Sequence, residues 1–264
     1  MALFDNLPQL YKDERDDREL VSFITLRRAV GFLGIGFPIL LILGGFVFSP
    51  CLSEETVGAC TRVLPTLSEY YASGARDIFV GVLCVIGFFF FAYRGHSPED
   101  DIAGDLACFF ALGVALFPTT SQHMVIEKIH GASALGMFLV LFYFSACLFT
   151  LTKDSPREKA WQRVRRALGQ MGRRTALFIA RKPPTNDPTD HRSPRKRKRD
   201  DVYLICGGVI LACVLLCLLS FAIGVRTSPR YGRYNPVLIL EAVALIAFGF
   251  SWLVKGEVFL VDKD

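Results

Sequence analysis

The chain has 264 residues, of which 52% are hydrophobic and 21% are charged, and its formal net charge is +5. The apolar residues gather in long blocks, which is not the pattern of a soluble globular domain. The composition therefore excludes an ordinary soluble enzyme and indicates an integral membrane protein.

A helix needs about 20 apolar residues to cross the hydrocarbon core of a bilayer. Six blocks reach or approach this length, so the sequence predicts an all-α polytopic membrane protein with six transmembrane helices. In chain order the blocks are residues 29–48, 78–93, 102–118, 131–151, 202–225 and 236–254. The second and third are short or interrupted, and the brief link at 94–101 predicts a tight hairpin between them.

The positive charges predict the orientation. Of the 30 Lys and Arg residues, 24 fall in residues 1–28, 94–101 and 153–201 and in the C-terminal tail, whereas six fall in the other loops. Loops rich in Lys and Arg stay in the cytoplasm. We therefore expect both termini in the cytoplasm and a place in the bacterial inner membrane. The expected segments are 1–28, 29–152 with four spans, 153–201, and 202–264 with two spans.

The eight cysteines divide between a loop and the spans. Cys51 and Cys60 fall in the first outer loop, where an oxidising exterior would allow a disulfide, and the sequence leaves that pairing open. The other six lie in predicted spans, where buried thiols usually act as small hydrophobic groups.

The cytoplasmic segment 153–201 has two halves. In the first, apolar or near-apolar residues recur every three or four positions, at Trp161, Val164, Leu168, Met171, Thr175 and Phe178. This spacing predicts an amphipathic helix, whose basic side chains are Arg163, Arg165, Arg166, Arg173 and Arg174. Such a helix suits an anionic headgroup surface, and a loop that only sets the topology is the alternative.

The second half of this segment is rich in Pro and charge and predicts a disordered linker. Its basic run at 194–199 is read as a lipid-facing patch beside a span rather than as a nucleic-acid site. The expected partners are therefore membrane lipids, with anionic headgroups at the cytoplasmic face, and no nucleic acid.

Polar residues meet at the outer ends of the predicted spans: Ser68, Arg76, Asp77, His130 and Glu241. An ionisable residue within a span normally faces the bundle interior with a partner. We expect Glu241 to take its donor from Arg76 or from an arginine of residues 226–233. The cluster either pins the helix ends together or forms a pocket for a headgroup, an ion or a substrate.

A metal site is a weaker alternative at the same place. His123, Glu127 and His130 would share one face of a helix and are suitable zinc ligands, although their spacing is not the H-E-x-x-H motif. No cofactor is predicted apart from this zinc. Ser68 shows no positioned base in the sequence, and acid–base chemistry by Asp77 with His130 is the other catalytic option.

One stretch carries a resemblance. The runs "LSEYYASGARDIFVGVLCVIGFFFFAYRG", "DDIAGDLACFFALGVALFPTT" and "IHGASALGMFLVLFYFSACLFT" lie within residues 67–152, about a third of the chain. They resemble uncharacterised bacterial multi-span proteins and are remotely similar to the DRAM-type six-span proteins. That resemblance implies a six-helix bundle and lipid-related roles, and it supplies no active site.

The sequence thus favours a non-enzymatic membrane protein of structural or lipid-interacting role. A membrane-embedded lipid hydrolase that uses the outer polar cluster is the first alternative. A small proton-coupled transporter, with Glu241 and Asp105 as its carboxylates, is the second.

Overall fold

The computed structural model describes residues 7–48, 63–94, 98–119, 124–151, 160–179, 194–224 and 234–260, and it is helical throughout this part of the chain, without strands. The α-helices are α2 (Leu7–Phe48), α3 (Arg76–Ala92), α4 (Pro98–Leu116), α5 (Met124–Tyr143), α6 (Ala160–Ile179), α7 (Pro194–Ala222) and α8 (Pro236–Lys255). A 3₁₀ turn, η2 (Ser68–Ala72), precedes α3, and a π-helical turn, η3 (Phe144–Leu148), extends α5.

Four helical stretches are long and apolar enough to cross a membrane: Phe23–Phe48, Met124–Leu148, Arg195–Ala222 and Pro236–Lys255. The other two predicted spans form helices that fall short for physical reasons. Helix α3 has only 17 residues, and α4 starts with an acidic turn of Glu99, Asp100 and Asp101. The all-α membrane-type fold is thus confirmed, with four such helices where the sequence predicts six.

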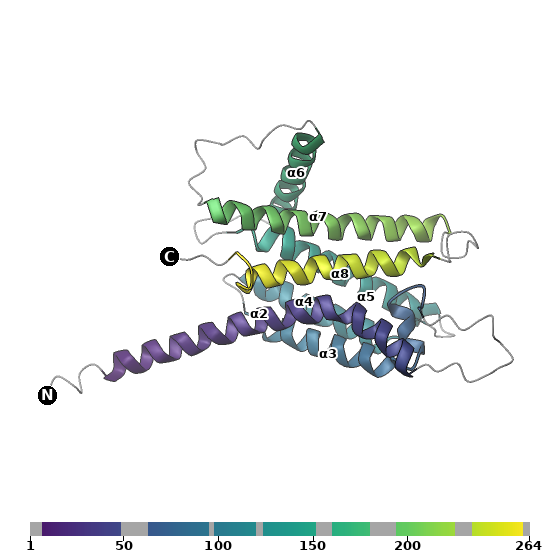
Figure 1. Ribbon diagram of the computed structural model, residues 1–264, viewed down its shortest axis with the longest axis horizontal. Coiled ribbons are helices and arrows are strands. Elements are labelled where there is room, and N and C mark those ends of the chain that lie inside the picture. The colour runs from purple at the N-terminus through teal and green to yellow at the C-terminus, as the bar shows by residue number, and fades with distance from the viewer. Residues whose placement is uncertain are drawn as a thin grey trace.

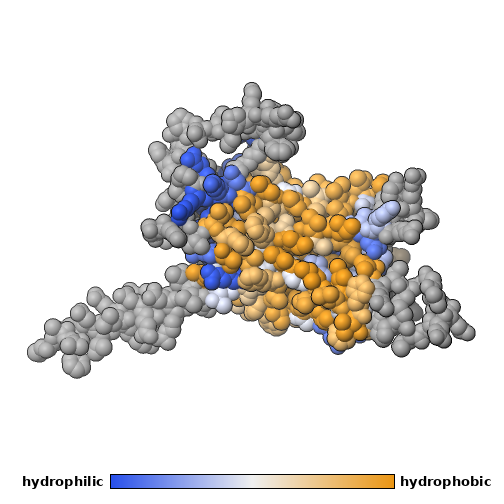
Figure 2. All heavy atoms as spheres, in the orientation of Figure 1, coloured by the Kyte–Doolittle hydropathy of each residue, from blue (hydrophilic) through white to orange (hydrophobic). Residues whose placement is uncertain are grey.

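The six longer apolar helices run side by side, and α6 crosses them at one end (Figure 1). On the face drawn in Figure 2, hydrophobic residues cover the middle of the bundle and hydrophilic residues gather at both ends. The start of α2 and the end of α8 point toward the end that carries α6. Residues 63–75, which we term the cap segment, lie at the opposite end.

Helices α2 and α8 touch through glycines. A Cβ atom on Gly249 would lie 2.5 Å from the Gly31 carbonyl oxygen and 2.9 Å from the Ile35 nitrogen, both on the α2 backbone. Only a residue without a side chain permits this approach, which is the usual way that membrane helices pack closely.

An aromatic cluster fills the core near the α6 end. Trp252 is fully buried, and the centroids of Tyr93, Phe149 and Phe90 lie 5.1, 5.4 and 5.6 Å from the centroid of its ring, each tilted steeply to it. Such edge-on pairs contribute about 0.5–1.5 kcal/mol each beyond their buried area. This cluster joins α3, α8 and the end of η3 into one core.

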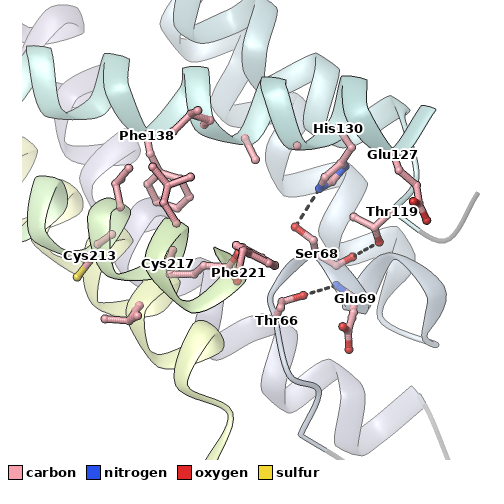
Figure 3. Close-up of a pocket in the computed structure, with 18 residues that line it drawn as sticks. Thr66, Ser68, Glu69, Thr119, Glu127, His130, Phe138, Cys213, Cys217 and Phe221 are labelled. Carbon is pink, nitrogen blue, oxygen red and sulfur yellow. Dashed lines mark hydrogen bonds between the residues drawn. The ribbon is translucent and has the colours of Figure 1, made fainter. Parts of the chain in front are cut away.

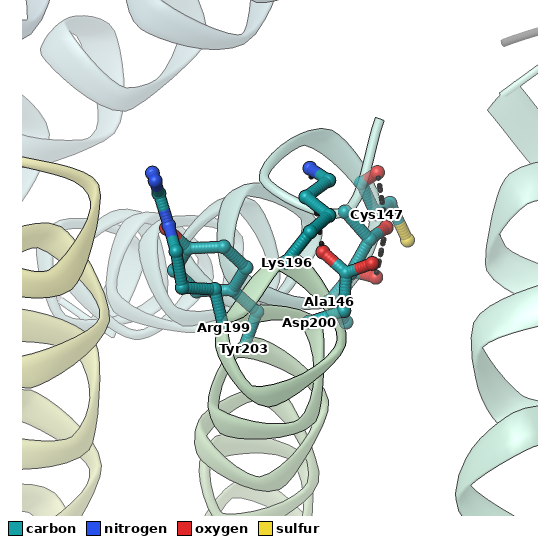
Figure 4. Close-up of polar contacts among 7 residues, drawn as sticks. Ala146, Cys147, Lys196, Arg199, Asp200 and Tyr203 are labelled. Carbon is teal, nitrogen blue, oxygen red and sulfur yellow. Dashed lines mark hydrogen bonds and ion pairs between the residues drawn. The ribbon is translucent and has the colours of Figure 1, made fainter. Parts of the chain in front are cut away.

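The first turns of α7 correct one expectation. Residues 194–201, which the sequence predicts as part of a disordered linker, are helical. Pro194 starts the helix, where its missing N–H costs nothing. Lys196 pairs with the buried Asp200 at 3.4 Å, and Arg199 donates to the Tyr203 hydroxyl at 3.5 Å, both one turn apart (Figure 4). These contacts and the long apolar helix beyond them carry the helix back to Pro194.

The amphipathic helix predicted in the cytoplasmic segment is present as α6. Its expected start near residue 155 lies outside the described residues, and the described helix begins at Ala160. Ala167 is buried, and Val164 and Met171 pack against the core. The apolar face predicted from the spacing therefore rests on the bundle in this half of α6.

Candidate functional site

The cap segment is tied to the start of α8. The Leu238 N–H, one of the amides that the first turn of a helix leaves without a partner, donates to the Pro65 carbonyl at 3.0 Å. The Leu67 N–H donates to Glu241 Oε2 at 2.7 Å. Tyr70, at the middle of η2, is fully buried. Together these contacts hold Ser68 in place against α5 and α8.

Ser68 and His130 form a hydrogen-bonded pair. His130 Nε2 lies 2.9 Å from Ser68 Oγ, and His130 Nδ1 lies 2.6 Å from the Phe117 carbonyl oxygen, which can only accept. Nδ1 therefore carries the hydrogen, and in the neutral ring Nε2 accepts from the Ser68 hydroxyl. His130 is 3% exposed. The imidazole is thus held in one tautomer by a backbone group.

This pair lines a cavity of about 340 Å³ between α5, α7, α8 and the cap segment (Figure 3). Its polar end is formed by Thr66, Ser68, Glu69, Thr119, Glu127 and His130. Its apolar end is formed by Phe138, Cys213, Val214, Cys217, Leu218 and Phe221. Ligand pockets commonly start at about 300 Å³, so this amphipathic cavity has the size and the two-sided chemistry of a site for an amphiphile.

Glu241 reaches the same cavity from α8. The sequence predicts an arginine as its donor, and the donor that the structure describes is the Leu67 backbone N–H. Residues 226–233, which hold the other candidate arginines, lie outside the described residues. The expectation of a partnered carboxylate near the mouth of the bundle is confirmed, and the nature of this donor differs.

Arg76 and Asp77 lie away from the cavity. Arg76 Nη2 donates to the Tyr71 hydroxyl at 3.0 Å, and its guanidinium sits 4.7 Å from the centroid of the Tyr71 ring. Asp77 is exposed in the first turn of α3, where its charge suits the helix dipole. Within the described part of the chain the two residues therefore make separate contacts rather than one ion pair.

The candidate zinc ligands are only partly described. Glu127 and His130 both line the cavity from α5, and His123 lies outside the described residues. Within the described part of the chain, no three His, Cys, Asp or Glu side chains are grouped closely enough to hold a metal. Both ring nitrogens of His130 already have hydrogen-bond partners. The zinc site stays a prediction.

The basic residues of α6 serve different ends. Arg163 is buried and forms an ion pair with Glu99 at the start of α4, so it binds the protein rather than a lipid surface. Arg165 and Arg173 are exposed, and Arg166 is half-buried. The side chain of Arg174 lies outside the described residues, as do Cys51 and Cys60 with their candidate disulfide.

Sequence reasoning missed the base beside Ser68. It paired His130 with Asp77 instead, because both stand where a predicted span begins. The signal that was present is the polar stretch of residues 66–69 together with Thr119 and His130, all at predicted span ends. Only the folding of the cap segment over α8 brings these groups together. Cys213 and Cys217, treated as ordinary span residues, also line the cavity.

Fold and site together define an all-helical membrane-type protein with an amphipathic cavity at one end of the bundle. No family model matches the chain, and no curated protein or solved structure matches it either.

Proposed function

We propose that this chain is an integral membrane protein that holds a lipid in the cavity beneath the cap segment. The observation that carries the proposal is the division of the cavity into a polar end at Ser68 and His130 and an apolar end at Phe138 and Phe221. A lipid has the same division, and the apolar end faces residues of α7 that are themselves exposed on the bundle.

The proposal includes six membrane-crossing helices, with α3 and α4 as a short hairpin within the bundle. Arg94 supports this hairpin, because its Nη1 lies 3.4 Å from Asp105 Oδ1 across the α3–α4 link. We place both termini in the cytoplasm of a bacterial inner membrane, on the strength of the positive charges. The exposed Arg165 and Arg173 of α6 would then meet anionic headgroups. The similarity to DRAM-type proteins stays part of this proposal.

The test is lipid retention after mild extraction. A Cβ at Gly131 meets no atom within 4 Å, and Gly131 lines the cavity, so Gly131→Leu fills the cavity without a clash at the first atom. We expect mass spectrometry to find a lipid with the wild-type chain and at least fivefold less with Gly131→Leu.

The matched control is Gly81→Leu on α3, a helical glycine with the same open surroundings that does not line the cavity. It should retain lipid as the wild type does. Equal loss from both variants, or retention by both, would contradict a lipid in this cavity.

A second function, hydrolysis of a lipid ester, is favoured by one observation: the 2.9 Å contact between Ser68 Oγ and His130 Nε2. In this reaction the Ser68 hydroxyl proton passes to Nε2 while Oγ bonds the acyl carbon. The proton then goes to the departing alcohol oxygen, and water later cleaves the acyl-serine.

A fluorophosphonate probe tests this second function, because it bonds an activated serine with loss of fluoride. Labelling should occur in the wild type, disappear in Ser68→Ala and fall at least tenfold in His130→Gln. A wild-type chain that keeps its lipid and takes up no label would exclude the hydrolase.

The transporter alternative has less support. Glu241 lies under the cap segment, whereas Asp105 pairs with Arg94 near the start of α4. The two carboxylates belong to opposite ends of the bundle and no described contact links them, so we do not carry this alternative further.

A further inference from the structure

The polar end of the cavity is acidic. Glu69 from the cap segment, Glu127 from α5 and Glu241 from α8 all line it, and the described lining contains no Lys or Arg. Three carboxylates from three separate elements repel a phosphate or a carboxylate headgroup and attract a cation, and the effect is stronger near the low-dielectric interior than in water.

The hydrogen-bond pattern points the same way. The Ser68 hydroxyl donates to His130, the His130 N–H donates to the Phe117 carbonyl, and the Thr119 hydroxyl donates to the Ser68 carbonyl at 3.4 Å (Figure 3). These hydrogens are therefore committed to the protein. What the polar end presents to a ligand is acceptors, namely carboxylate oxygens and the lone pairs of the Ser68 hydroxyl.

The apolar end opens to the outside of the bundle. Leu218 and Phe221 on α7 line the cavity, and they are 46% and 53% exposed. A hydrocarbon tail can therefore leave the cavity along α7 into the surrounding bilayer while its headgroup stays under the cap segment. The shape of the site fits an amphiphile better than a free ion.

We infer that the cavity binds an amphiphile whose headgroup carries a net positive charge on an ammonium nitrogen. This inference rests on the proposed lipid-binding function and names its ligand class. A primary ammonium supplies three N–H donors and one positive charge, which match an acceptor-rich and acidic pocket. An anionic phospholipid offers the opposite of both.

Three probes with the same tail test the inference: octadecylamine, octadecanol and octadecanoate. Each is added to the purified full chain in a nonionic detergent, and bound probe is counted by native mass spectrometry. We expect the amine to bind at least tenfold more tightly than the alcohol, and the octadecanoate to bind most weakly.

Three isosteric variants, Glu69→Gln, Glu127→Gln and Glu241→Gln, remove one charge each. Each should weaken binding of the amine by about threefold to tenfold and leave binding of the alcohol unchanged. Asp77→Asn is the matched control, since it removes an exposed carboxylate at the same end that does not line the cavity.

The outcomes separate the inference from the proposed function. If all three probes bind alike and Gly131→Leu weakens them all, the cavity is a lipid site without preference for a cation, and the inference fails alone. If Gly131→Leu changes the binding of no probe, the cavity is not a lipid site and both fail.

Discussion

At the scale of single residues, the cap segment depends on hydrogen bonds that no side-chain pattern reveals. The sequence correctly indicates that Glu241 needs a partner, because a carboxylate in a span is costly alone. It points to arginines, whereas the described donor is the Leu67 N–H. The direction of a backbone amide follows from the path of the whole cap segment, so this contact could not be predicted from residue types.

The first prediction concerns this contact. Glu241→Ala removes the acceptor of the Leu67 N–H, and Leu67 is 5% exposed, so a nearly buried amide loses its partner. Such a loss costs about 1–3 kcal/mol. The free energy of unfolding in detergent should fall by that amount, whereas Glu241→Gln, which keeps an acceptor oxygen, should stay close to the wild type. Equal stability of the two variants would rule out this contact as a fastening of the cap segment.

At the scale of elements, composition and spacing predict most of the helices. The apolar blocks and the amphipathic spacing correspond to α2 to α8, and Pro236 starts α8 as expected. The ends are less well predicted. The π turn at Phe144–Leu148 and the helical residues 194–201 depend on packing against α7 and on contacts one turn apart, which local composition does not show. Helix contacts such as Gly31 with Gly249 also need the fold, since many other glycines lie in the spans.

The second prediction tests that helix contact. Gly249→Ala places a Cβ against the α2 backbone, which cannot give way as a flexible side chain can. Overpacking of this kind costs about 1–3 kcal/mol, so thermal unfolding in detergent should shift to lower temperature. The matched change Gly81→Ala meets no atom within 4 Å and should leave the transition unmoved. A Gly249→Ala chain as stable as the wild type would mean that α2 and α8 do not approach this closely.

At the scale of the whole molecule, the bundle has an apolar middle and two polar ends of different charge. Basic side chains of α2, α6 and α7 gather at one end, and the carboxylates of the cavity lie at the other. The class and this polarity were predictable from block lengths and from the positions of Lys and Arg. The cavity was not, because it forms from four elements that are far apart in the sequence.

The third prediction concerns the direction of insertion. Because positive charge is retained in the cytoplasm, alkaline phosphatase fused after Tyr234 should be active in the periplasm. A fluorescent protein fused after Asp264 should fold and fluoresce inside the cell. An inactive phosphatase at the first site would reverse the orientation and place the cavity at the cytoplasmic face.

The length of α2 has a consequence for how its first half folds. At 42 residues it is about 63 Å long, roughly twice the hydrocarbon thickness of a bilayer. An isolated helix of the length that projects from the bundle is marginal in water, because its first turn must be nucleated at a large entropic cost. Here nucleation has already taken place in the apolar half, so each residue of the projecting half has only to add to an existing helix. The membrane-embedded half thus acts as a template for the water-exposed half.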